Sequence, residues 1–198
     1  AQQAQTGLTR VMQGINPSNF VKELAPGEMF ETPEAVLCHS DAGFGGMSAR
    51  MHQFVTEHIV PEYWKDRERP LLINNWEGTF FDFNTEKLVA FADTAKELGI
   101  EMLVMDDGWF GKRNDDNCSL GDWFVNEQKL PGGLGVLIDQ IHARGLKFGM
   151  WFEPEMVSPD SELYRAHPNW TVKINEREPT QTRWQLVLDL TNPEVCDY

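Results

Sequence analysis

The chain has 198 residues, of which 41% are hydrophobic and 24% charged, as in a globular protein with one domain or parts of two. Its net charge of −14 disfavours a nucleic-acid partner and an anionic substrate, because phosphate binding needs clustered Lys and Arg. No apolar run approaches the roughly 20 residues of a membrane span, so we expect no membrane partner.

The first part of the chain, roughly residues 6–58, is rich in turn residues and indicates the end of a β domain. Short strands are expected near residues 19–24, 28–31 and 35–39, and a helix over 47–57. A charged linker over residues 61–70 follows. We therefore assign residues 1–60 to the end of a β domain plus linker.

Beyond residue 70, expected strands alternate with expected helices. Strands are predicted at 71–75, 101–105, 146–152 and 185–190, and helices at 85–98, 134–144, 161–167 and from Asn192-Pro193 onward. Asn84 is the expected N-cap of the first of these helices and Gly99 its C-terminal stop. This alternation implies right-handed βαβ units and a parallel sheet, closed into a TIM barrel or open and doubly wound.

The barrel is favoured because no GxGxxG follows the first strand, whereas acidic and aromatic residues end several successive strands. Only three or four strands fit before Tyr198, and an eight-stranded barrel needs about 250 residues. The predicted fold class is therefore α/β, with residues 61–198 as the first half of a TIM (β/α)8 barrel.

Side chains suited to sugars follow three of the expected strands. The apolar run at 102–105 ends in Asp106, Asp107 and Trp109, and Trp76 and Trp151 lie at the ends of the neighbouring strands. Carboxylates accept hydrogen bonds from hydroxyl groups, and an aromatic ring packs on the apolar face of a sugar. The sequence therefore indicates carbohydrate chemistry.

The residues alone leave the roles of these acids open. Asp107 and Glu153 on neighbouring strands would form a retaining glycosidase pair if about 5–5.5 Å apart, or would hold the ligand or cap loops. Together with Asp106 and Glu155 they would instead offer oxygen ligands to Mg²⁺ or Ca²⁺, although no histidine joins them and no metal is expected. We expect Asp115, Asp116 and Asp122 to lie in a solvated loop.

The cysteines and the N-terminus bear on the compartment. Cys38, Cys118 and Cys196 lack the CxxC spacing of a zinc site, and their odd number and wide separation favour a reducing compartment. The N-terminus shows neither the basic nor the apolar region of a signal peptide. The expected location is cytoplasmic.

Five long segments, in order along the chain, carry a resemblance to a known family: LLINNWEGTFFDF (71–83), VMDDGWFGKRNDD (104–116), SLGDWFVNEQKLPGGL (119–134), GMWFEPEMVSPDSELYRAHPNW (149–170) and QLVLDLTNPEV (185–195). They resemble bacterial α-galactosidases of glycoside hydrolase family 36. The resemblance implies a retaining hydrolase, without a cofactor, that releases terminal α-linked galactose from melibiose, raffinose and related oligosaccharides. It also implies that residues 1–60 are the C-terminal part of an N-terminal β-sandwich domain plus linker, and that the whole protein is a homo-oligomer, often a tetramer.

The resemblance also assigns roles to residues. It implies that Asp106 and Asp107 bind the galactose hydroxyls O4 and O6, that Trp76 and Trp151 wall the sugar site, and that Arg183 reaches the same subsite. In this family both catalytic groups are aspartates, and the nucleophile lies in a Lys-Trp-Asp motif that these 198 residues lack. The chain alone is therefore expected to hold no catalytic residue and to be inactive.

Two alternatives to an α-galactosidase stay open. One keeps the fold and changes the reaction, to an α-N-acetylgalactosaminidase or a galactosyl-transferring enzyme. The other is a noncatalytic galactoside-binding protein.

Overall fold

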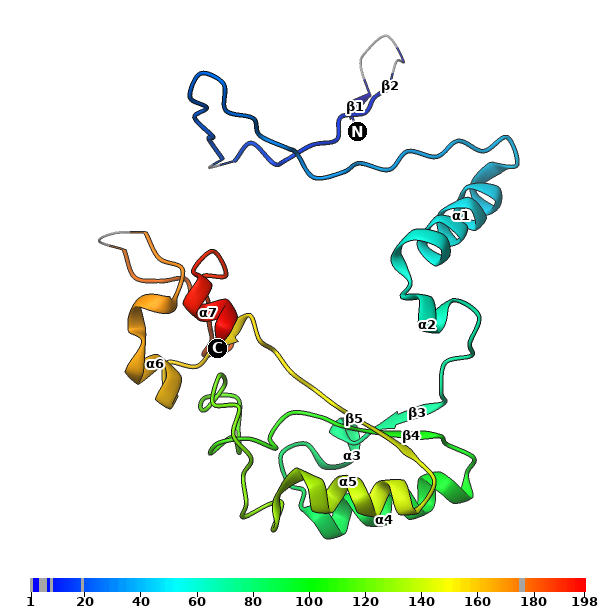
Figure 1. Cartoon of the computed structure of the whole chain (residues 1–198), viewed down its shortest axis with the longest axis vertical. Helices are drawn as coiled ribbons and strands as arrows, with labels where there is room; N and C mark the ends of the chain where they lie inside the picture. The colour runs from blue at the N-terminus through cyan, green and yellow to red at the C-terminus, as the bar shows by residue number, and fades with distance from the viewer. Residues whose placement is uncertain (1, 4–6, 8, 19, 175–176) are drawn as a thin grey trace. The chain divides into compact units, whose positions relative to one another are not determined.

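The computed structural model describes residues 2–3, 7, 9–18, 20–174 and 177–198 (Figure 1). Contacts within the chain divide it into two compact units, Ala1–Glu68 and Arg69–Tyr198. The domain assignments of residues 1–60 and 61–198 stay predictions. Within the described residues, no helix has both the length and the apolar character needed to cross a membrane.

The first unit contains little regular structure before its helices. β1 (Gln2–Gln3) pairs antiparallel with β2 (Thr9–Arg10), and α1 (Gly43–Phe54) continues into the π-helical turn η1 (Val55–Ile59) before α2 (Glu62–Lys65). The expected helix at 47–57 is confirmed and begins earlier, at Gly43.

The strands expected near 19–24, 28–31 and 35–39 are wrong for the described residues, because residues 20–42 contain no strand and residue 19 lies outside the description. A strand is defined by the ladder of hydrogen bonds to a neighbour, and the sequence pattern of a segment does not supply that neighbour. Residues 20–42 form no such ladder in the structure.

The second unit is built on a parallel sheet of three strands in the order β3-β4-β5. The strands are β3 (Leu72–Asn74), β4 (Met102–Met105) and β5 (Lys147–Met150). Figure 1 shows α4 (Thr85–Glu97) and α5 (Gly133–Ala143) lying beside each other along the sheet, and the short α3 (Trp76–Thr79) follows β3. These strands, their parallel pairing and both long helices are as expected from the sequence.

Local signals explain where α4 begins and ends. The Asn84 side chain accepts a hydrogen bond from the Lys87 N–H at 2.9 Å, which satisfies one of the free donors of the first turn. Gly99 has a φ of 78°, the left-handed conformation that commonly ends a helix. The expected cap and stop are both confirmed.

The core of this unit lies between the sheet and the two helices. The members that β4, α4 and α5 contribute to it include Leu88, Ala92, Leu103, Met105, Leu137 and Ile141, all fully buried. Burying a side chain of leucine size contributes about 1.5–3 kcal/mol. This layer fixes the carboxyl ends of the three strands at one edge of the sheet.

A second hydrophobic cluster forms around the last third of the chain. It joins β6 (Met156–Val157), α6 (Glu162–Ala166), the 3-10 turn η2 (Pro168–Trp170), β7 (Leu186–Val187) and α7 (Pro193–Asp197). The helices expected at 161–167 and after Asn192 are confirmed.

The strand expected at 185–190 does not join the parallel sheet. β7 is shorter than expected and pairs antiparallel with β6. Its other side is also occupied, because Val172 N donates to Val187 O at 2.8 Å and Asp189 N donates to Trp170 O at 2.7 Å. Alternating apolar residues predict a strand, but they do not select its partner.

Candidate functional site

The carboxyl ends of β3 and β4 are joined through two asparagines. Asp106 N donates to the buried Asn75 Oδ1 at 2.8 Å, and the Asn74 side chain donates to Asp106 Oδ2. Asp106 Oδ1 accepts the N–H of Asp107 at 2.7 Å. The Asp106 carboxylate is therefore oriented by its neighbours while remaining partly exposed.

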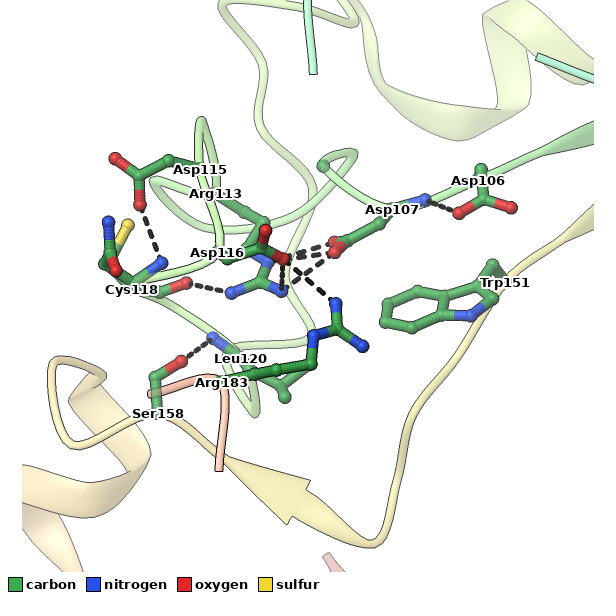
Figure 2. A network of polar contacts seen from close by, with 12 residues as sticks. Asp106, Asp107, Arg113, Asp115, Asp116, Cys118, Leu120, Trp151, Ser158 and Arg183 are labelled. Atoms are coloured by element: carbon green, nitrogen blue, oxygen red, sulfur yellow. Dashed lines mark hydrogen bonds and ion pairs between the residues drawn. The ribbon is translucent and has the colours of Figure 1, made fainter. Parts of the chain in front are cut away.

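Asp107 forms a buried ion pair with Arg113. The Arg113 Nε lies 3.0 and 3.1 Å from the two carboxylate oxygens, and Nη2 lies 2.8 Å from Oδ2 (Figure 2). Asp107 is 4% exposed and Arg113 is fully buried. Arg113 Nη1 also donates to Cys118 O at 2.9 Å, so the guanidinium holds the Asp107 loop against the turn at 113–118. A carboxylate accepts about four hydrogen bonds, and these contacts leave about one position for a ligand.

Lys129 supports the same loop from another direction. Its ammonium donates to the carbonyl oxygens of Phe81 and Gly108 at 2.9 Å and to that of Arg113 at 3.0 Å. Burial lowers the pKa of Lys129, and the charge of Asp107 acts in the opposite direction. One side chain thus binds the backbones that follow β3 and β4.

An aromatic cluster surrounds Trp151, which directly follows β5. The partly exposed Trp151 is stacked with Phe110 at 6.4 Å between ring centroids and lies 6.4 Å from Trp123. Trp109 belongs to the core and donates from Nε1 to Trp151 O at 3.0 Å. Trp151 therefore has a fixed position with part of its ring free.

Trp76 belongs to a separate aromatic group. Its ring meets those of Phe80 and Phe81 edge to face, at 5.3 and 5.0 Å. Its backbone N–H donates to Asn74 Oδ1 at 2.7 Å, and Asn74 also bonds Asp106. The position of Trp76 is thus linked to the Asp106 carboxylate through one asparagine.

Arg183 stands at the tip of a tight turn before β7. Arg183 and Trp184 have positive φ values of 52° and 60°. Arg183 Nη2 lies 3.1 Å from Asp116 Oδ1, and the same oxygen lies 3.6 Å from Arg113 Nη2. Figure 2 shows the resulting series of contacts, from Asp107 through Arg113 and Asp116 to Arg183.

Glu153 lies in the electrostatic field of this network. Burial raises the pKa of Glu153, and Glu155 and Asp107 raise it further, while Arg183 and Arg113 lower it. The buried, arginine-bound state of Asp107 disfavours its use as a nucleophile paired with Glu153. Across the described residues, no three His, Cys, Asp or Glu side chains are grouped as a metal site would require.

The structure thus links Asp106 with Asp107 directly, and Asp107 with Arg183 through Arg113 and Asp116. Sequence reasoning missed Arg113, Lys129 and the role of Asp116. The signal in the sequence that could have indicated a partner for the two aspartates was the basic pair Lys112-Arg113, which follows them within one glycine-containing loop.

The expected solvated loop is wrong for Asp122. That side chain is 3% exposed and accepts the N–H groups of Glu162 and Leu163 at 3.1 and 3.0 Å. A carboxylate at the start of a helix satisfies its free donors, and this contact draws Asp122 inside.

Comparison with known proteins identifies the family of this fold and site. The Melibiase family model matches residues 29–198, and the chain belongs to this family. It is 55% identical over 194 residues to alpha-galactosidase AgaA of Geobacillus stearothermophilus, covering 98% of this chain and 27% of that protein. It is 50% identical over 193 residues to alpha-galactosidase Mel36A of Lactobacillus acidophilus, covering 98% of this chain and 26% of that protein.

Solved structures of such enzymes contain the same fold. The crystal structure of AgaA matches with a TM-score of 0.90 at 56% identity, over 93% of this chain and 26% of that one. Variants of AgaA have been crystallised in complex with raffinose and with stachyose. The chain therefore has the α/β fold of α-galactosidase domains of glycoside hydrolase family 36 and spans about a quarter of the length of these curated relatives.

Proposed function

We propose that the protein carrying this chain is an α-galactosidase, a retaining glycoside hydrolase that releases terminal α-linked galactose from oligosaccharides of the melibiose and raffinose type. The observation that carries this proposal is the 55% identity to AgaA over 98% of the chain. The complexes of AgaA variants with raffinose and stachyose support this substrate class.

In this proposal, the chain supplies the sugar-recognition part of the site. Asp106 accepts hydrogen bonds from galactose hydroxyls, which fits its partly exposed carboxylate and its orientation by Asn74. Asp107 binds a neighbouring hydroxyl through its remaining acceptor position. A site built to bond a given hydroxyl rejects isomers that leave its polar groups unpaired, so these two carboxylates would select galactose.

The aromatic residues and the arginine complete the proposed subsite. The rings of Trp76 and Trp151 pack against the sugar as the walls of its site, and Arg183 donates hydrogen bonds to it from the turn before β7. The partly exposed rings of both tryptophans support this assignment. The two catalytic aspartates lie outside this chain, so the chain orients the sugar and the missing groups cleave the bond.

The proposal extends to architecture and context. β3, β4 and β5 form part of the first half of a TIM barrel, which their parallel order supports. Residues 1–60 belong to the end of a β-sandwich domain. The whole protein is a homo-oligomer of the cytoplasm, and the free state of Cys38, Cys118 and Cys196 fits a reducing compartment.

The test is hydrolysis of an aryl α-galactoside by the gene product that contains this sequence. Turnover with release of galactose is the expected result, whereas the 198-residue chain alone is expected to release none. Faster turnover of an aryl N-acetyl-α-galactosaminide, or transfer of galactose to sucrose in place of hydrolysis, would change the assigned reaction. Galactose binding without turnover would identify a noncatalytic binder.

A further inference from the structure

Asp116 occupies a bridging position between two arginines. Its Oδ1 lies 3.1 Å from Nη2 of Arg183 and 3.6 Å from Nη2 of Arg113. Arg113 is fully buried and binds both oxygens of Asp107. A single carboxylate oxygen therefore lies between a buried arginine and an exposed one, and these belong to segments far apart in the sequence (Figure 2).

The turn that carries Arg183 has a conformation that its residues disfavour. Thr182 N donates to Gln185 O at 3.2 Å, and Gln185 N donates to Thr182 O at 2.9 Å, which closes a two-residue hairpin turn. The two central residues have positive φ, as in turns that usually contain Asn-Gly. Here they are Arg183 and Trp184, whose β carbons disfavour this region. Contacts outside the turn are therefore needed to stabilise it.

Asp116 supplies such a contact. Its ion pair with Arg183 links this turn to the loop that follows β4. Without it, the guanidinium of Arg183, whose side chain is 60% exposed, has many rotamers available in water. Fixing the guanidinium before a ligand arrives lowers the entropy lost on binding.

We propose that Asp116 is a positioning residue for sugar binding, which holds Arg183 over the site and, through Arg113, ties the turn at 182–185 to the buried Asp107. This inference rests on the proposed function, since it takes Arg183 as a ligand for the sugar. Asp116 itself makes no contact with the substrate.

The kinetic test is Asp116→Asn in the gene product, with KM and kcat measured on an aryl α-galactoside. KM is expected to rise about three- to fivefold, the size of a partly exposed ion pair, and kcat to stay within about twofold. In an Arg183→Gln background, Asp116→Asn is expected to change KM no further, because its effect acts through Arg183.

The matched control is Asp115→Asn. Asp115 lies in the same turn, and its Oδ1 accepts the Asn117 N–H at 2.8 Å, a bond that asparagine retains. This variant removes the same charge without a contact to Arg183 and is expected to keep the wild-type KM. An equal rise in KM for both variants would assign the effect to net charge and overturn the inference.

A readout independent of activity is tryptic cleavage after Arg183. Asp116→Asn is expected to speed cleavage there severalfold relative to Asp115→Asn, because the guanidinium is released. Unchanged cleavage and KM, an additive effect in the Arg183→Gln background, or a loss of thermal stability with a fall in kcat would each overturn the inference. Wild-type protein that cleaves no galactoside would refute the proposed function instead, while the trypsin comparison still decides whether Asp116 holds the turn.

Discussion

Replacing Arg113 by methionine tests the buried ion pair beneath the site. The substitution keeps an unbranched side chain of similar length but removes the charge and every donor that Asp107 and Cys118 O receive from Arg113. Asp107 would then be an unpaired carboxylate that is only 4% exposed. Arg113→Met is therefore expected to destabilise the fold strongly.

The magnitude follows from the burial of both partners. Removing one member of a buried pair costs about 3–5 kcal/mol, because the remaining charge is left without compensation. The lost bond to the Cys118 carbonyl adds about 1 kcal/mol, which the better burial of the methionine side chain partly offsets. We expect a net loss of about 4 kcal/mol, roughly a thousandfold in the unfolding equilibrium.

The assay is urea unfolding of the gene product, followed by tryptophan fluorescence. Arg165→Met is the matched control, because Arg165 also binds two carboxylates, those of Asp160 and Glu162 at 2.7 Å, but is 49% exposed. Its loss is expected to be much smaller, since solvent screens exposed pairs. Equal losses for the two methionine variants would refute the reasoning. The double variant Asp107→Leu with Arg113→Met is expected to be more stable than Arg113→Met alone.

Three other changes test the local structure. Gly108→Ala is expected to lower stability by about 2 kcal/mol in urea unfolding, because its φ is 102° and the added carbon would lie 2.9 Å from the Phe81 ring. Asn84→Ala removes the cap that accepts the Lys87 N–H and is expected to cost about 1 kcal/mol in the same assay. Burial raises the pKa of Glu153, so the folded state holds this proton to a higher pH than the unfolded chain, and stability falls as pH rises above the ordinary value of 4.5. Glu153→Gln is therefore expected to raise the thermal midpoint at neutral pH, with the gain shrinking as pH falls towards 4.5 and absent below it; a constant difference across pH would contradict this.

The elements that the sequence predicted correctly are those with local signals. The cap at Asn84 and the stop at Gly99 lie within one segment, and the structure confirms both of them. Whether residues 20–42 form strands, and which strand β7 pairs with, depends on distant segments. The strands expected in residues 20–42 and the parallel-sheet position expected for residues 185–190 were wrong.

The site was predictable to a similar extent. The end of β4 after Met105 placed Asp106 and Asp107 correctly at the edge of the sheet, because a parallel strand in a packed layer has a definite carboxyl end. The burial of Arg113 was not predictable, since arginine is almost never fully buried unless paired, and its partner Asp107 lies six residues away across a loop whose conformation the sequence pattern does not give. The roles of Asp106 and Asp107 in sugar binding stay predictions.

The three carbonyl bonds of Lys129 have an evolutionary consequence. Every amino acid carries the backbone carbonyl that this ammonium binds, so the loops after β3 and β4 can exchange side chains without losing the tie. An insertion or deletion in either loop would instead shift a carbonyl out of reach of the ammonium. Relatives that have diverged in ligand preference should therefore differ here by substitution and retain the loop lengths.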